Sequence, residues 1–207
     1  MTKRRIIVTG SAGDPVTEAH RELAKTLARS GIGDLLLWFP TGTRRDKDLT
    51  ASVHRARMSE LAFSDRWRQR LPIEFRLDLR DVHRPNPSTI DRMRELAQEF
   101  PDAEPCFAVG ADAVVPKEKW GGKCDIAGYW NDGETLMRDF TFIVLPREGY
   151  PHPKDVDLPK HWHIHDVPSI PVSSTEVRRR VRANEPYAHL VPQEVAEYIR
   201  HNELYLN

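Results

Sequence analysis

The residues with the clearest chemistry stand near the start of the chain, in the stretch GSAGDPVTEAH. Two glycines follow an apolar run, and Thr17 and His20 then come at the start of a predicted helix. Residues three apart lie on one face of a helix, and the free N–H groups of a helix start attract phosphate. A hydroxyl and an imidazole at that place can donate hydrogen bonds to phosphate oxygens. The stretch therefore predicts a site for the phosphates of a nucleotide.

A second helix start of the same kind lies far downstream, in IPVSSTEVRRRV. Ser173 and Glu176 fit the capping-box pattern S-x-x-E, which by itself predicts only a well-capped helix. Ser174, Thr175 and the free N–H groups there also make an anion site, and Arg178 can bind two phosphate oxygens at once. Two phosphate-type helix starts in one chain indicate a phosphate-binding site much more specifically than either alone.

The first turn has a second interpretation, the dinucleotide-binding turn of an oxidoreductase. VTGSAG resembles the beginning of T-G-x-x-G-x-x-G, the fingerprint of short-chain dehydrogenases, but Val16 stands where its third glycine would be. The following apolar run ends in LWFP, with no acidic residue to bind a ribose hydroxyl, and a YxxxK pair is missing. These three departures count against an oxidoreductase.

Alternating apolar runs and amphipathic stretches must position these residues. The expected strands are 5–9, 34–40, 73–79, 105–110 and 140–146, and the expected helices are 15–31, 51–65, 87–100, 173–184 and 192–204. Apolar strands that alternate with helices predict a parallel sheet covered on both faces. Ligands of such sheets bind beyond the carboxyl ends of the strands, where the first glycine turn lies.

The fold class we predict is α/β, a Rossmann-like doubly wound parallel sheet with helices on both faces. We expect a single domain over residues 1–207, with a small helical part over about 173–207. The stretch 121–137 is rich in glycine and irregular in pattern, so it is interpreted as a long loop or lid. The stretch 147–162 is interpreted as a proline-rich surface connection.

The amino-acid composition argues against several classes of function. Of the 207 residues 39% are hydrophobic, and the 31 Lys and Arg residues balance the 31 Asp and Glu residues, so nucleic acid and membrane surfaces are not expected partners. Two cysteines are too few for a disulfide framework, and no apolar run has the roughly 20 residues of a membrane span. We expect a cytoplasmic protein. His161, His163 and His165 alternate as on an exposed edge strand, and we predict no protein metal site.

Taken together, these motifs resemble those of the nicotinate (nicotinic acid) mononucleotide adenylyltransferases, in the nucleotidylyltransferase superfamily. The first turn resembles the superfamily signature that ends in T/HxGH, and the second helix start resembles I-S-S-T-x-[IV]-R. The resemblance covers nearly the whole chain and extends to HRARMSELAF, PSTIDRMREL, FAVGADAVVPKEKW, FIVLPREGY and YAHLVPQEVAEYIRHNELY. Two positions differ from the family pattern: Gly13 stands in place of Phe, and Ala19 in place of Gly.

The resemblance implies an adenylyltransferase of NAD biosynthesis that joins ATP, with Mg²⁺, to nicotinate mononucleotide and releases pyrophosphate. The catalytic residues it implies are Thr17, His20, Lys47 and Arg178. The ATP-binding residues it implies are Gly10, Ser11, His20, Asp112, Ser174, Thr175 and Arg178. The mononucleotide-binding residues it implies are Trp120 at the pyridine ring and the backbone near Thr89 at its carboxylate.

Two alternatives stay open at this point. The same scaffold could transfer the adenylyl group to nicotinamide mononucleotide or phosphopantetheine, since the acceptor depends on Trp120 and on the atypical stretch 121–137. A relative that binds nucleotide without catalysis is the other alternative, because Gly13 and Ala19 depart from the pattern. The oligomeric state is not readable from the sequence, so a homo-oligomer stays open.

Overall fold

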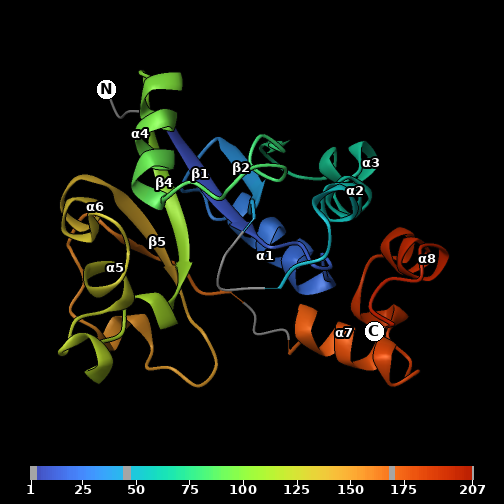
Figure 1. The fold of residues 1–207 in the computed structure, drawn as a ribbon. Helices are drawn as coiled ribbons and strands as arrows, with labels where there is room; N and C mark the ends of the chain where they lie inside the picture. The colour runs from blue at the N-terminus through green and yellow to red at the C-terminus, as the bar shows by residue number, and fades with distance from the viewer. Residues whose placement is uncertain (1–3, 44–47, 168–170, 207) are drawn as a thin grey trace. The chain divides into compact units, whose positions relative to one another are not determined.

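The computed structural model describes residues 4–43, 48–167 and 171–206. Six strands form one sheet in the order β3-β2-β1-β4-β5-β6. Their bounds are β1 (Arg4–Ser11), β2 (Leu35–Pro40), β3 (Glu74–Leu77), β4 (Ala103–Gly110), β5 (Thr141–Leu145) and β6 (His163–Ile164). Figure 1 labels β1, β2, β4 and β5 of this sheet. The order runs outward from β1 to β3 and then, on the other side of β1, from β4 to β6. This reversal is that of a doubly wound sheet, and it confirms the predicted α/β class.

The helices follow the strands in alternation. Their bounds are α1 (Glu18–Ala28), α2 (Ser52–Ala62), α3 (Asp65–Arg68), α4 (Thr89–Glu99), α5 (Asp125–Gly128), α6 (Gly133–Asp139), α7 (Ser174–Arg182) and α8 (Gln193–His201). The short 3₁₀ helices are η1 (Ala111–Ala113), η2 (Glu118–Trp120), η3 (Pro153–Asp155) and η4 (Ala188–Leu190). No helix in the described ranges is long and apolar enough to cross a membrane.

The residues group into two compact units. Unit 1 comprises Met1–Thr9, Ser30–Leu36 and Pro87–Ser169, and unit 2 comprises Gly10–Arg29, Leu37–Asn86 and Ile170–Asn207. The assignment of all 207 residues to a single domain stays a prediction.

Unit 1 is built on parallel strands. Arg4 of β1 pairs with Ala103 of β4, and Gly110 at the end of β4 pairs with Leu145 at the end of β5. All five residues of β5 are buried, as expected for a strand covered on both faces. The hydrophobic core around β5 takes side chains from α4, α5 and α6, and the rings of Phe142 and Trp162 pack in it with centroids 4.6 Å apart.

Unit 2 has an aromatic cluster around Phe63, which follows α2. Its ring centroid lies 4.8 Å from that of Trp38 on β2, 5.1 Å from that of Trp67 and 5.1 Å from that of Phe75. Helices α2 and α8 are joined by a hydrogen bond of 3.0 Å between His54 Nδ1 and the Tyr198 hydroxyl. The cluster and this bond hold β2, α2, α3, β3 and α8 together within unit 2.

The predicted elements are found within a few residues of their expected bounds, with one clear correction. The stretch 121–137 is not a long loop, because it contains α5 and the first part of α6. Ile126 and Leu136 are fully buried in the core of unit 1, so tertiary burial outweighs the glycine-rich composition. A side chain at Gly133 would overlap the carbonyl oxygen of Ile126, so this glycine serves close packing.

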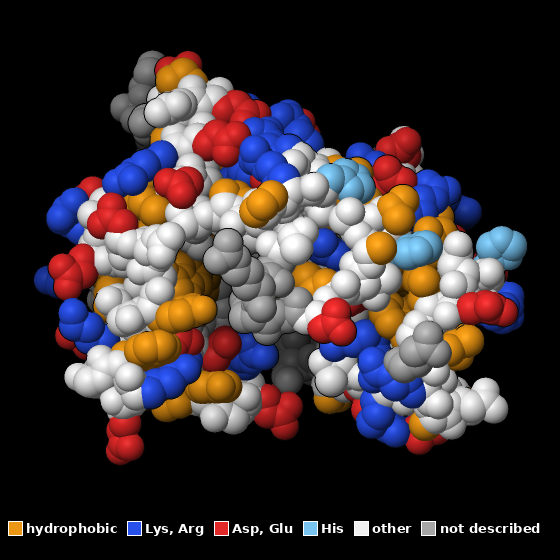
Figure 2. Space-filling view, in the orientation of Figure 1, with side chains coloured by type: hydrophobic (Ala, Val, Ile, Leu, Met, Phe, Trp, Pro, Cys, Tyr) orange, Lys and Arg blue, Asp and Glu red, His pale blue; other side chains and the backbone are white. Residues whose placement is uncertain are grey.

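The visible surface carries both signs of charge. Figure 2 shows Lys and Arg side chains interspersed with Asp and Glu over the face in view, with no extended area of one sign. This mixture agrees with the balanced composition and offers no broad basic surface for a polyanion on that face.

Candidate functional site

Residues 10–17, the end of β1 and the turn into α1, carry the first predicted phosphate site, and we call them the first phosphate turn. Thr17 is the N-cap of α1, and its backbone N–H donates to His20 Nδ1 at 3.0 Å. The Thr17 hydroxyl oxygen lies 2.9 Å from the same nitrogen. Because an N–H donor points at Nδ1, that nitrogen is an acceptor and the proton of neutral His20 lies on Nε2. His20 therefore presents an N–H donor from its other ring nitrogen.

Desolvation of the partly buried imidazole sets the charge of His20. It lowers the pKa of the imidazole from 6.5 to about 4, and the ring packs edge-on against Trp38 with centroids 5.8 Å apart. His20 is therefore neutral near pH 7, and its Nε2–H is available as a hydrogen-bond donor.

The lowered pKa makes stability depend on pH. The folded state binds fewer protons at His20 than the unfolded state between pH 6.5 and 4, so the contribution of His20 to stability is complete above about 6.5 and is lost toward 4. We expect wild type to lose on the order of 2 kcal/mol more than His20→Gln over this range. Denaturant unfolding at a series of pH values measures the difference, and parallel curves for the two proteins would contradict it.

The start of α7 is the second phosphate element, and it is hydrogen-bonded to the first turn. Ser173 caps the helix by accepting from the Glu176 N–H at 3.1 Å, as the capping pattern predicted. Ser174 Oγ donates to the Pro15 carbonyl at 2.9 Å, and Arg178 Nη1 donates to the Asp14 carbonyl at 2.6 Å. Two motifs that stand about 160 residues apart are thus neighbours in unit 2.

The four arginines of α7 have different roles. Arg179 and Arg180 both bond to Glu176, and Arg179 also bonds to Glu185. Hydrogen bonds from Arg179 and Arg180 hold the pKa of Glu176 at about 2. Arg178 bonds instead to Thr175 Oγ1 at 3.3 Å and to the first turn. Arg179 and Arg180 therefore belong to a surface ion-pair network, whereas Arg178 is directed to the first phosphate turn.

Arg55 on α2 holds the first phosphate turn in place, and no role was assigned to it from the sequence. Its guanidinium is 1% exposed and donates to backbone carbonyls of four separate segments, those of Ala12, Thr41, Thr50 and Val82. It thereby ties the first phosphate turn to the segment that follows β2. The signal available beforehand was its place in HRARMSELAF, one of the stretches that resemble the family.

Several residues of the first phosphate turn stabilise its backbone conformation. A side chain at Gly10 would overlap the Phe39 carbonyl, and Gly13 has a φ of 62°, a region that favours glycine. Ser11 Oγ accepts from the Gly13 N–H at 3.1 Å. Thr17 is fully buried, so its hydroxyl is directed at His20 in this structure. Lys47 lies outside the described residues.

Asp112 lies in unit 1, in η1 directly after β4. Its carboxylate pairs with Arg147 at 2.9 Å. The two residues meet because β4 and β5 are parallel and in register at their carboxyl ends, where Gly110 pairs with Leu145. Arg147 was not assigned a role from the sequence, although it is the first charged residue after the fifth strand.

Trp120 also lies in unit 1, at the end of η2. Its Nε1 donates to Asp125 Oδ1 at 2.7 Å, and its ring stacks on Tyr129 with centroids 5.3 Å apart. Lys119 Nζ lies 4.7 Å from the ring centroid. Desolvation alone would raise the pKa of Asp125, but hydrogen bonds from Lys117 and Trp120 hold it below its ordinary value. Trp120 is thus oriented by a charged partner and is already part of an aromatic stack.

Thr89 is the first residue of α4, behind the N-cap Ser88. Ser88 Oγ accepts from the Asp91 N–H at 3.3 Å and so caps the helix. The helix therefore starts where the sequence predicts, and its first backbone N–H groups lie at Thr89 and Ile90.

The three alternating histidines lie at the sheet edge. His163 belongs to the edge strand β6, and His161 Nε2 lies 3.3 Å from the Phe140 carbonyl. Burial and the nearby Arg5 lower the pKa of His163. Within the described ranges, no three His, Cys, Asp or Glu side chains are grouped as metal ligands.

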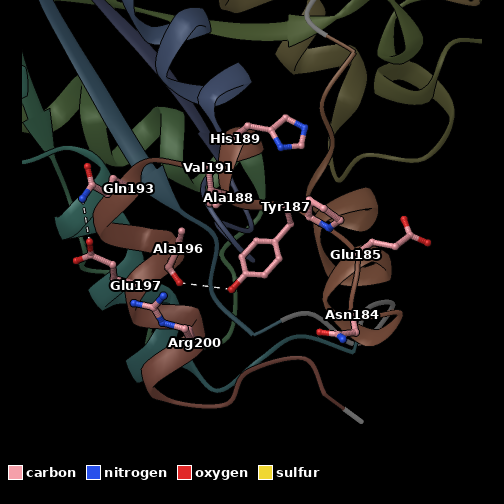
Figure 3. Close-up of a pocket in the computed structure, with 11 residues that line it drawn as sticks. Asn184, Glu185, Tyr187, Ala188, His189, Val191, Gln193, Ala196, Glu197 and Arg200 are labelled. Carbon is pink, nitrogen blue, oxygen red and sulfur yellow. Dashed lines mark hydrogen bonds between the residues drawn. The ribbon is translucent and has the colours of Figure 1, made fainter.

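A cavity in unit 2 lies apart from these residues. It encloses about 870 Å³ and is lined by residues 184–200 of α8 and the segment before it, with the Tyr187 hydroxyl bonded to the Ala196 carbonyl (Figure 3). None of the predicted site residues lines it. A smaller cavity of about 300 Å³ borders Asp14, Arg178 and Tyr205 instead. Of the predicted site residues, Arg178 borders this smaller cavity.

Comparison with known proteins shows the family to which the chain belongs. Residues 8–180 match the model of the cytidylyltransferase-like family. The chain is 32% identical over 208 residues to a probable nicotinate-nucleotide adenylyltransferase of Leifsonia xyli subsp. xyli, covering 99% of this chain and 95% of that protein. It is 30% identical over 208 residues to the nicotinate-nucleotide adenylyltransferase of Bacillus subtilis, covering 98% of each.

A solved structure shows the same fold. Plasmodium falciparum nicotinic acid mononucleotide adenylyltransferase, complexed with NaAD, matches with a TM-score of 0.78 at 21% identity, over 98% of this chain and 97% of that chain.

Proposed function

Because this chain belongs to the nicotinate-nucleotide adenylyltransferase family, we propose that it joins MgATP and nicotinate mononucleotide to give deamido-NAD and pyrophosphate, in NAD biosynthesis. One observation carries the proposal beyond family membership. The two phosphate-type helix starts are hydrogen-bonded to each other in unit 2, through Ser174 to Pro15 and Arg178 to Asp14. This arrangement suits a triphosphate, which needs donors over several oxygens.

The reaction is a displacement at phosphorus. A phosphate oxygen of the mononucleotide attacks the α-phosphorus of MgATP, and the bond from that phosphorus to the bridging oxygen breaks. The electron pair of that bond leaves on pyrophosphate, and Mg²⁺ enters as part of the MgATP substrate. No covalent intermediate with the protein is needed, so the protein contributes position and positive charge.

The residues of unit 2 have complementary roles in this step. His20 donates its Nε2–H to a phosphate oxygen, and Thr17 holds the ring in the tautomer that makes this possible. Arg178 keeps three of its five N–H groups after the bonds to Asp14 and Thr175, and these are the donors we assign to the departing pyrophosphate. We assign further triphosphate contacts to the first-turn backbone at Gly10 and Ser11, to Ser174 and Thr175, and to Lys47.

The residues of unit 1 are assigned to the nucleosides. We propose that Asp112, held by Arg147, binds the adenosine part of ATP, and that Trp120 borders the pyridine ring. The backbone N–H groups at Thr89, at the start of α4, suit the carboxylate of nicotinate.

Trp120 is expected to affect one substrate selectively. Trp120→Ala should raise KM for the mononucleotide about tenfold, because an aromatic contact is lost, while KM for ATP changes less than about twofold. Trp120→Phe should keep most of the affinity. Steady-state kinetics with each substrate varied in turn measure this, and Lys123→Ala in the same segment is the control. An equal rise in both KM values would contradict the assignment.

The experiment that tests the proposed function compares acceptors. Purified protein receives MgATP with nicotinate mononucleotide, nicotinamide mononucleotide or phosphopantetheine, and pyrophosphate release is followed over time. We expect the highest kcat/KM with the nicotinate form and loss of turnover in His20→Ala. Preference for another acceptor would mean that the protein is an adenylyltransferase of another pathway. No turnover with any acceptor would contradict an enzymatic role.

A further inference from the structure

Asp14 is a buried carboxylate in the first phosphate turn. It is 1% exposed, and its Oδ2 accepts from the Thr50 N–H at 3.1 Å. Its Oδ1 accepts from the Tyr205 hydroxyl at 2.7 Å, across 191 positions of the sequence. A buried carboxylate is costly unless its oxygens are paired, so each of these donors matters to the position of the turn.

The backbone of the same turn holds the phosphate residues of α7. The Asp14 carbonyl accepts from Arg178 at 2.6 Å, and the adjacent Pro15 carbonyl accepts from Ser174 at 2.9 Å. A shift of the Asp14 side chain therefore moves the acceptors on which Arg178 and Ser174 depend.

Tyr205 lies almost at the end of the described chain, beyond α8. Burial, with the nearby Asp14 carboxylate, raises the pKa of its hydroxyl, so the group remains a proton donor at all ordinary pH values. The residue has a φ of 67°, a conformation that non-glycine residues adopt only when their surroundings hold them. Tyr205 also borders the 300 Å³ cavity, together with Asp14 and Arg178. The cavity leaves room for the turn to move if its hydrogen bond to Tyr205 is lost.

We propose that Tyr205 is a positioning residue for adenylyl transfer, which acts through Asp14 to hold the first phosphate turn and thereby Arg178. The inference rests on the proposed function, since it assigns Tyr205 to the triphosphate side of that reaction. It predicts that removing one hydroxyl near the C-terminus impairs the use of ATP and spares the mononucleotide.

The test is Tyr205→Phe, with Tyr198→Phe as the matched control. Tyr198→Phe removes an equivalent hydroxyl hydrogen bond in the same unit. That bond goes to His54 on α2 and not to the phosphate turn. We expect kcat/KM for ATP to fall about tenfold in Tyr205→Phe and less than about twofold in Tyr198→Phe. KM for the mononucleotide should stay within about twofold of wild type in both. Melting curves set a common temperature at which all variants are folded.

A double-mutant cycle separates positioning from general stability. In an Arg178→Ala background, Tyr205→Phe should cause almost no further loss, because its effect passes through Arg178. Additive losses, or equal losses in the two tyrosine variants, would overturn the inference. If Tyr205→Phe does not fold, Asp14→Asn takes its place, because the NH2 group of asparagine cannot accept a hydrogen bond and one of the two donors, Thr50 or Tyr205, loses its acceptor. An unchanged kcat/KM for ATP in Asp14→Asn would then overturn the inference. Absence of wild-type turnover would instead overturn the proposed function.

Discussion

Replacing Arg178 with alanine is expected to lower kcat at saturating MgATP by about 100-fold or more, the largest effect of any single arginine in α7. Arg178 bonds to the Asp14 carbonyl and Thr175, and not to the glutamates that neutralise Arg179 and Arg180. Its remaining N–H groups are the donors we assign to the negative charge that develops on pyrophosphate. Loss of one such preorganised donor costs about 10²–10³ in kcat.

The matched control for this prediction is Arg179→Ala. It removes an equal charge from the adjacent position, but from an exposed network with Glu176 and Glu185. Exposed ion pairs contribute little, so we expect kcat within about twofold of wild type. Pre-steady-state and steady-state rates of pyrophosphate release measure both variants. Similar losses in the two would mean that net charge, and not the placement of Arg178, supports the reaction.

The second large effect is expected at His20. His20→Ala should lower kcat about 100-fold, because it removes the Nε2–H donor and the acceptor of the Thr17 N–H together. His20→Gln should retain more activity, since its amide can donate from a similar position. The exposed His189, in the same unit, gives the control His189→Ala, for which we expect unchanged rates.

The pH profile distinguishes a neutral donor from a cation at this position. With a pKa of about 4, His20 does not titrate between pH 6 and 8, so it should contribute no change in kcat/KM over that range. A fall in kcat/KM above pH 6.5 that is absent from His20→Gln would contradict the neutral assignment and would require the imidazolium form.

The first phosphate turn and the start of α7 could be predicted because their signals are local. Glycine positions, the Ser173–Glu176 cap and the spacing of Thr17 and His20 are readable within a few residues. The family predicted from those motifs is confirmed by the comparisons, as is the sheet class. The interpretation of His20 as a direct phosphate donor stays a prediction.

The features that could not be predicted depend on long-range contacts. Arg55 gathers carbonyls from four segments, and Tyr205 meets Asp14 across almost the whole chain. No pattern within a helix reveals such partners. The stretch 121–137 was misread because its glycines indicate a loop, while the burial of Ile126 and Leu136 in the core of unit 1 supports helices instead.

Gly13, which departs from the family pattern, is explained by its backbone. Its φ of 62° suits glycine, and an added Cβ would approach Ser59 Oγ to 3.1 Å. The turn therefore keeps its hydrogen bonds with a smaller residue than the pattern has, and the departure is compatible with an intact phosphate site.

The most direct test of the account identifies the product. Wild-type protein is incubated with MgATP and nicotinate mononucleotide, and the dinucleotide is identified by mass while pyrophosphate is counted. We predict deamido-NAD and pyrophosphate in equal amounts, with both lost together in Arg178→Ala. Pyrophosphate without a dinucleotide, or a dinucleotide formed only from another acceptor, would contradict the central claim.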